Sequence, residues 1–126
     1  MIVLDTHAWL WWQAEPRKLS RAGRRAIEQA DRVGVSAISV FELAELAERR
    51  RIGLDAPIRA WVLEALAQER VEPLPVTTEV AVDAAQLRFT GDPFDRIIYA
   101  TARAKDAQLV TRDERMRDFD AERTVW

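Results

Sequence analysis

Four acidic residues fall in the caps or first turns of predicted helices, and they are the side chains with which this chain could do chemistry. We refer to Asp5, Glu42, Asp95 and Asp113 as the four acids. Each of them also has an ordinary structural interpretation. A carboxylate accepts hydrogen bonds from the free N–H groups at a helix start and favours the positive end of the helix dipole.

The position of Asp5 favours a shared site. It directly follows the apolar run Ile2–Leu4, which is typical of a strand buried on both faces of a parallel sheet. Ligands of an open α/β sheet bind just beyond the carboxyl ends of its strands. At least three of the helices that carry the four acids follow or face a strand end. Because such ends share one edge of a parallel sheet, we expect the four carboxylates to meet in one cleft.

Carboxylates held within a few ångströms of one another repel and raise each other's pKa, and a divalent cation offsets that repulsion. Oxygen ligands without cysteine favour Mg²⁺ or Mn²⁺ over Zn²⁺. Such a centre suits phosphodiester hydrolysis: one ion activates a water, and a second, about 3.5–4 Å away, stabilises the leaving oxygen. A Ser–His or Cys–His nucleophile pair is not expected. His7 is the only histidine, and we interpret it as a residue of the first helical turn.

Three hydroxyl residues lie near the four acids in sequence and could orient a carboxylate or a metal-bound water: Thr6, Ser39 and Thr111. For Ser39 a second role is predicted. The segment Ser39-Val40-Phe41-Glu42 matches a capping box, in which Ser39 caps the helix and Glu42 reaches back to the Ser39 amide.

Two arginines adjoin the acids: Arg96 follows Asp95, and Arg112 precedes Asp113. They could grip the phosphates of a substrate or only balance charge, and the sequence leaves both possibilities open. Asp92, three residues before Asp95, is interpreted as the cap of a helix whose first residue is a proline.

Composition places the chain among soluble globular proteins. It has 126 residues, which predicts one domain over 1–126, with 48% hydrophobic and 32% charged residues and a net charge of −2. No apolar run is long enough to span a membrane, and no secretion signal is recognised. The absence of cysteine excludes disulfides and thiolate metal sites and fits the reducing cytoplasm.

Strands alternate with helices along the chain, which predicts an α/β fold: a three-layer α/β/α sandwich on a mostly parallel central sheet. The helices are expected at 8–13, 20–30 with Ser20 as cap, 39–51, 55–70, 78–88 with Thr78 as cap, 92–105 and from 113. The strands are expected at 2–4, 33–38, 71–76 at a sheet edge, 108–111 and 124–126, with a loop at 89–91.

Four blocks occur in order along nearly the whole chain: LDTHAWLWW, SAISVFELAEL, DPFDRIIYATA and LVTRDERM. The ordered set resembles the PIN-domain ribonucleases and, within them, the VapC-type toxins of type II toxin–antitoxin pairs. Matched by position, the four acids correspond to the acidic quartet of that family, and Thr6 and Thr111 correspond to hydroxyl positions near it.

The resemblance implies a PIN-like fold and a Mg²⁺- or Mn²⁺-dependent endoribonuclease that cleaves RNA as a toxin. It also implies a homodimer and neutralisation by a cognate antitoxin whose tail lies across helices near the site. If exposed, Trp9, Trp12, Phe41 and Trp61 would offer a groove for a partner helix; otherwise they are ordinary core.

Alternative functions remain open at this point. A phosphate-handling α/β domain of the haloacid-dehalogenase type needs a second aspartate two residues after Asp5, where this chain has His7. A receiver-like signalling module needs a lysine at a late strand end, and the only lysines are Lys18 and Lys105. In a third alternative, the chain is a binding module whose acids are all helix caps.

Overall fold

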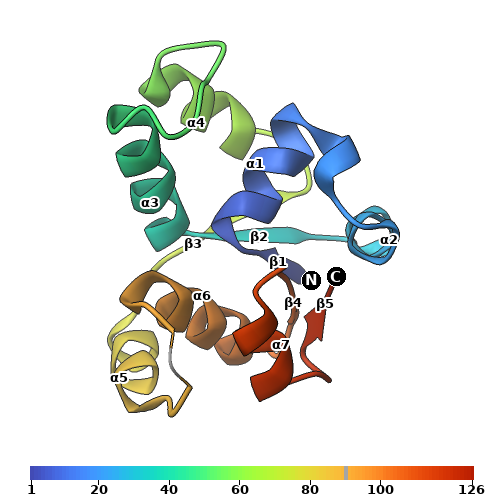
Figure 1. Cartoon of the computed structure of the whole chain (residues 1–126), viewed down its shortest axis with the longest axis vertical. Helices are drawn as coiled ribbons and strands as arrows, with labels where there is room; N and C mark the ends of the chain where they lie inside the picture. Colours follow the sequence, from blue (N-terminus) through green and yellow to red (C-terminus); the bar gives the residue numbers. More distant parts are fainter. Residues whose placement is uncertain (90) are drawn as a thin grey trace.

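A five-stranded sheet of order β3-β2-β1-β4-β5 forms the centre of the computed structural model, which describes residues 1–89 and 91–126 (Figure 1). Every strand pair in the described residues is parallel, as expected for an α/β fold. The strands are β1 (Ile2–Leu4), β2 (Val33–Ser36), β3 (Val71–Leu74), β4 (Gln108–Val110) and β5 (Thr124–Val125). The loop predicted at 89–91 includes Thr90, which lies outside the described residues.

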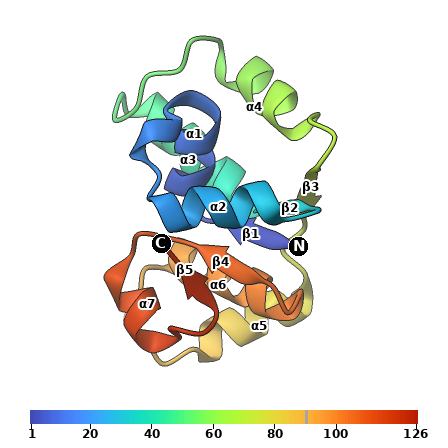
Figure 2. The ribbon, with the colours of Figure 1, turned by 90° about the vertical axis from the view of Figure 1, so that its right-hand side faces the viewer.

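Helices cover both faces of the sheet and confirm the three-layer sandwich (Figures 1 and 2). One face carries α1 (Thr6–Ala14), α2 (Arg21–Gln29), α3 (Ala37–Glu48) and α4 (Ile58–Leu66), with the short 3₁₀-helix η1 (Pro16–Lys18) between α1 and α2 in the chain. The other face carries α5 (Thr78–Gln86), α6 (Pro93–Ala104) and α7 (Glu114–Phe119). Among the described residues, no helix has the length and apolar character that crossing a membrane requires.

The central strand β1 shows why its sequence is apolar throughout. Side chains of a strand point alternately to opposite faces. Ile2 and Leu4 join the core cluster that contains Trp9 of α1, whereas Val3 joins the cluster that contains Ile98 of α6. Because helices cover both faces, both sets are buried, and no polar position alternates with them.

The connections of the sheet create a crevice between β1 and β4. The chain runs from β1 to β2 and β3 through helices on one face, and from β3 to β4 and β5 through helices on the other. The strand order therefore changes direction between β1 and β4, which are direct neighbours. Beyond the carboxyl ends of two such strands, the flanking loops diverge and leave room for a ligand.

The start of α3 differs from the prediction. Strand β2 ends at Ser36, and Ser36 rather than Ser39 caps the helix, with its Oγ accepting a hydrogen bond from the backbone N–H of Ile38 at 3.2 Å. Ser39 is the third residue of α3, so the predicted capping box with Glu42 is wrong. The run Val33–Ile38 is apolar and β-branched enough to be mistaken for one longer strand, because periodicity does not separate short buried strands from buried helix starts.

Other boundaries shift by a few residues. Thr77 rather than Thr78 caps α5, because its hydroxyl accepts a hydrogen bond from the N–H of Val80. Helix α4 begins only at Ile58, after Pro57, and is shorter at both ends than the predicted 55–70. Strand β3 lies at the sheet edge as predicted.

Two of the tryptophans expected in the aromatic groove for a partner helix are core residues, whereas Trp12 is partly exposed. Trp9 is completely buried and Trp61 is 8% exposed, and their rings pack edge to face at 5.3 Å. Phe41, by contrast, is 53% exposed. The interpretation of Trp9 and Trp61 as core is therefore correct.

Replacement of Ser36 and Ser39 by alanine will show which serine caps α3. Ser36→Ala is expected to lower the free energy of unfolding by about 1 kcal/mol, because an N–H at the start of α3 loses its partner. Ser39→Ala is expected to change it by less than about 0.5 kcal/mol, because the Ser39 hydroxyl has no hydrogen-bond partner to lose. Urea unfolding measures both values, and a larger cost for Ser39→Ala would contradict the assignment.

Candidate active site

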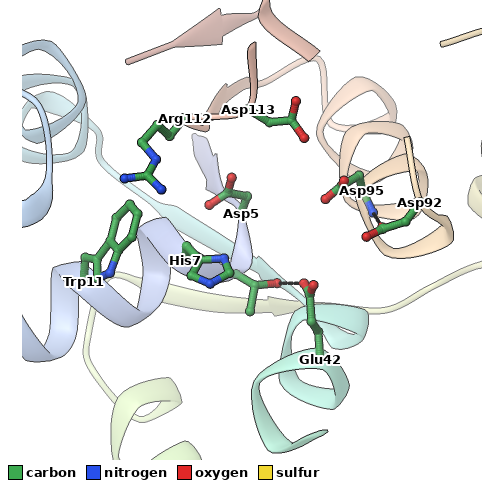
Figure 3. Close-up of a pocket in the computed structure, with 9 residues that line it drawn as sticks. Asp5, His7, Trp11, Glu42, Asp92, Asp95, Arg112 and Asp113 are labelled. Carbon is green, nitrogen blue, oxygen red and sulfur yellow. Dashed lines mark hydrogen bonds between the residues drawn. The ribbon is translucent and has the colours of Figure 1, made fainter. Parts of the chain in front are cut away.

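The four acids meet in one cleft of about 270 Å³ at the carboxyl edge of β1 and β4 (Figure 3). The residues lining it come from the loops and from the first two turns of helices at this edge: Asp5, Thr6, His7, Trp11, Glu42, Asp92, Asp95, Arg112 and Asp113. The geometric expectation that these carboxylates converge is confirmed.

Asp5 and Asp113 each cap a helix and also face the cleft. The Asp5 Oδ1 accepts a hydrogen bond from the N–H of Ala8 at 2.8 Å, and the Asp113 Oδ1 accepts one from the N–H of Arg115 at 2.8 Å. The backbone N–H of Asp5 donates to the carbonyl of Val110 at 3.1 Å, which ties the end of β1 to the end of β4. Capping therefore fixes these two carboxylates in the cleft instead of competing with a role there.

The start of α6 supplies two carboxylates. Asp92 caps the helix as predicted, accepting a hydrogen bond from the N–H of Asp95 at 2.9 Å, and Pro93 occupies the first helical position. Both Asp92 and Asp95 line the cleft. Figure 3 shows them side by side, opposite Asp5 and Asp113.

Two predicted hydroxyls are hydrogen-bonded to acids. The Thr6 hydroxyl donates to the carboxylate of Glu42, which joins the start of α1 to α3. The Thr111 hydroxyl accepts a hydrogen bond from the N–H of Asp113 at 3.1 Å and forms a hydrogen bond with the side chain of Asp5. Ser39 is different: its Oγ is buried without a hydrogen-bond partner among the described residues, and it does not line the cleft.

Of the two arginines that adjoin the acids in sequence, only one lies at the cleft. Arg112 lines the cleft, but Arg96 points away from it and donates to the carbonyls of Ala84 and Ala85 at 3.0 and 3.1 Å. Of the two roles left open for Arg96, a grip on a substrate phosphate in this cleft is not supported by its position. Its hydrogen bonds join α6 to the end of α5, because the helix turns this side chain outward from the face that carries Asp95.

The sequence reasoning missed Arg115. Its guanidinium lies 3.4 Å from the carboxylate of Asp113 and 3.9 Å from that of Asp95, so it bridges two of the four acids. A basic residue in the first turn of α7 is unfavourable for the helix dipole. This unfavourable position of a basic residue was the signal in the sequence that Arg115 interacts with an acidic residue outside its own helix.

Burial and mutual repulsion hold protons in the cleft. Burial raises the pKa of Asp95 to about 7, with further increases from the charges of Asp92, Asp113, Glu42 and Asp5. Burial also raises the pKa of Asp5 and of Glu42, although hydrogen bonds from Thr111 and Thr6 oppose the change. Burial therefore makes the ionised forms of Asp5, Glu42 and Asp95 less favourable than those of exposed carboxyl groups.

The donor set of the cleft fits a hard divalent cation. Five of its nine lining residues are acids and one is a threonine, and a bound cation would favour the ionised forms of the acids. Within residues 1–89 and 91–126, no three acidic or histidine side chains form a ready-made cage. Mg²⁺ does not need one, because it keeps several waters and binds through one or two carboxylates.

The alternative phosphate-handling domains lack their required groups here. His7, where a phosphatase of that type needs aspartate, is a solvent-exposed residue of the first turn of α1. Neither lysine lines the cleft: Lys18 pairs with Glu15 at 3.1 Å, and Lys105 lies at the far end of α6. A receiver-type phosphate site is therefore not formed.

Comparison with known proteins agrees with this fold. The PIN domain family matches residues 2–122, and the chain belongs to this family. Ribonuclease VapC22 of Mycobacterium tuberculosis is 49% identical over 129 residues, covering 99% of this chain and 98% of that protein.

Solved structures share the fold. A toxin–antitoxin complex from Klebsiella pneumoniae has a TM-score of 0.71 at 18% identity, covering 100% of this chain and 97% of its own. FitAcB from Neisseria gonorrhoeae has a TM-score of 0.63 at 25% identity, with coverage of 100% and 97%.

The raised pKa of Asp95 predicts how stability without divalent ions depends on pH. Below pH 3.8, the ordinary pKa of an aspartate, Asp95 is protonated in both the folded and the unfolded chain and does not lower the free energy of unfolding. As pH rises toward about 7, the unfolded chain ionises while the folded chain keeps its proton, so the free energy of unfolding falls. Asp95→Asn removes this penalty and is expected to be more stable than the wild type by on the order of 2 kcal/mol at pH 8.

Urea unfolding in EDTA at pH 5 and pH 8 measures this difference. The stabilisation by Asp95→Asn should grow between the two pH values. Asp83→Asn, which changes an exposed acid on α5 away from the cleft, serves as the matched control. An equal effect of Asp95→Asn at both pH values would show that its ionisation is not coupled to folding.

Proposed function

We propose that this chain is a metal-dependent endoribonuclease that hydrolyses RNA phosphodiester bonds as the toxin of a toxin–antitoxin pair, with a single PIN domain over 1–126. The observation that carries the proposal is the meeting of four acids in one cleft of a PIN-family chain. The 49% identity to a ribonuclease over 99% of this chain supports the choice of RNA as substrate.

Asp5, Asp95, Asp113 and Glu42 are the proposed ligands, directly or through water, and Mg²⁺ or Mn²⁺ is the proposed ion. A divalent cation bound there supplies Lewis acidity, which lowers the pKa of water and stabilises negative charge on a leaving oxygen. The chain itself keeps the donors in place. Helix capping and Thr111 hold Asp5, and Thr6 holds Glu42, so little rearrangement is needed when the site is filled.

The raised pKa values couple the binding of a cation to the loss of protons from these acids. Burial raises the pKa of Asp95 to about 7, so a cation bound beside it would favour the loss of its proton. Arg115, which contacts Asp95 and Asp113, balances part of their charge. Thr6 and Thr111 are proposed to keep the neighbouring carboxylates oriented throughout the reaction.

A cognate antitoxin is the proposed protein partner, and the active form is a proposed homodimer in the cytoplasm. Two solved neighbours are described as a toxin–antitoxin complex from Klebsiella pneumoniae and as VapBC2 from Rickettsia felis bound to a promoter DNA fragment. Exposed apolar side chains on the helical layer above the cleft support a partner on this chain. Phe41 of α3 is 53% exposed and Leu63 of α4 is 61% exposed.

The activity is tested with Asp5→Asn. Purified wild-type protein is expected to cleave total bacterial RNA at discrete positions with Mg²⁺ or Mn²⁺, and EDTA is expected to stop it. Asp5→Asn is expected to lower the cleavage rate at least about 100-fold, because it removes a proposed metal ligand. Asparagine also caps helices, so the fold should be retained. Gel analysis of the RNA and circular dichroism of the protein measure these outcomes.

Arg25→Ala is the matched control, because Arg25 is an exposed residue of α2 outside the cleft. Cleavage by Asp5→Asn at the wild-type rate would contradict the role of Asp5. Failure of the wild type to cleave RNA with either ion would contradict the proposed activity.

A further inference from the structure

One side of the cleft is built from a cation and aromatic rings instead of acids. Figure 3 shows Arg112, Trp11 and His7 on the side of Asp5 opposite to Asp92 and Asp95. The Arg112 Cζ lies 5.0 Å from the centre of the Trp11 ring, within the range of a cation–π contact. One side of the cleft therefore carries acidic side chains and the other carries a positively charged one. The proposed ligands for a cation line only the acidic side.

Trp11 is a rigid support for this contact. It belongs to α1, is 7% exposed and packs in the core cluster above the sheet. The centre of the Trp11 ring lies 5.5 Å from the centre of the His7 ring and 5.8 Å from the centre of the Trp126 ring. Because neighbours on two sides restrain the indole, the position of the Arg112 guanidinium is set by the fold and not by the arginine alone.

Arg112 is exposed and makes no hydrogen bond or ion pair among the described residues, although carboxylates line the same cleft. Arg115 instead bridges Asp113 and Asp95. A guanidinium held over an aromatic face does not use its N–H groups for that contact, so they can bind a phosphate through two oxygens. Trp11 thus holds Arg112 beside the acids with its donors available.

We propose that Trp11 is a positioning residue that holds Arg112 as the binding site for an RNA phosphate next to the one that is cleaved. This inference rests on the proposed function. The scissile phosphate lies at the four acids, and the neighbouring phosphate lies at Arg112. Among the described residues, the cleft offers a cation without an acidic partner at Arg112, so the RNA backbone extends from the acids toward that side.

Binding and cleavage are measured separately, so that the two proposals are tested independently. Binding uses the fluorescence anisotropy of a labelled single-stranded oligoribonucleotide of mixed sequence in Ca²⁺ at several salt concentrations. Arg112→Ala is expected to raise Kd about tenfold and to reduce the slope of log K against log salt by about 0.7, the value for one lost phosphate contact. Arg112→Lys is expected to recover less than half of the loss, because lysine lacks the planar fork. Arg25→Ala is the matched control for loss of one positive charge.

Trp11→Leu and Trp11→Phe test the positioning role. Trp11→Leu is expected to weaken RNA binding about as much as Arg112→Ala, whereas Trp11→Phe, which keeps an aromatic face, retains most of it. In the Arg112→Ala background, Trp11→Leu is expected to have no further effect on Kd, because the two residues act as a unit. In cleavage assays the same variants should raise KM and leave kcat within about twofold of the wild type.

The alternatives give different results. If Trp11 only stabilises the fold, Trp11→Leu lowers the melting temperature but leaves Kd and the salt slope unchanged, or weakens binding equally with and without Arg112. Either result overturns the inference. Unchanged Kd in Arg112→Ala also overturns it, even if the wild type cleaves RNA. Conversely, weakened binding by Arg112→Ala with no cleavage by the wild type contradicts the proposed activity and leaves the phosphate site supported.

Discussion

Electrostatic repulsion among carboxylates is the constraint on which this structure depends. The fold brings Asp5, Glu42, Asp92, Asp95 and Asp113 to one cleft, where burial, followed by like charge, raises the pKa of Asp5, Glu42 and Asp95. Helix N-termini, two threonine hydroxyls and Arg115 reduce that cost without removing it, since the pKa of Asp95 still rises to about 7. A protein keeps such an arrangement at the expense of its own stability. The proposed divalent cation would offset part of this cost, because its charge favours the ionised carboxylates.

Structural and chemical roles coincide in this cleft. Asp5, Asp92 and Asp113 each cap a helix through one carboxylate oxygen. The cap orients the side chain, and the helix dipole favours the ionised form that a metal ion requires. A role as a helix cap is therefore compatible with the proposed role as a metal ligand. The parallel sheet makes the coincidence possible, because its carboxyl edge is where strands end and helices begin.

The two sides of the cleft suit different parts of a polyanionic substrate. The acidic side repels a phosphate until cations cover it, whereas Arg112 on Trp11 attracts one directly. Arg115 differs from Arg112 because it pairs with Asp113 and Asp95, which is charge compensation within the protein. Arg96 differs from both, since it joins α6 to α5. Three arginines close to acids in sequence therefore have three separate environments.

Local sequence alone determined the kinds and order of elements, the parallel α/β class and the four acids. Apolar runs, capping residues and helix starts act over a few neighbouring residues, so their signals can be read without the fold. Only the tertiary structure decided that Ser36 rather than Ser39 begins α3, that Asp92 joins the acids in the cleft, and that Arg96 leaves it. It also placed Arg115 and Trp11, which lie on different helices, around the same acids. These outcomes depend on the strand order and on the rotation of each helix about its axis. Both are set by the packing of residues distant in sequence.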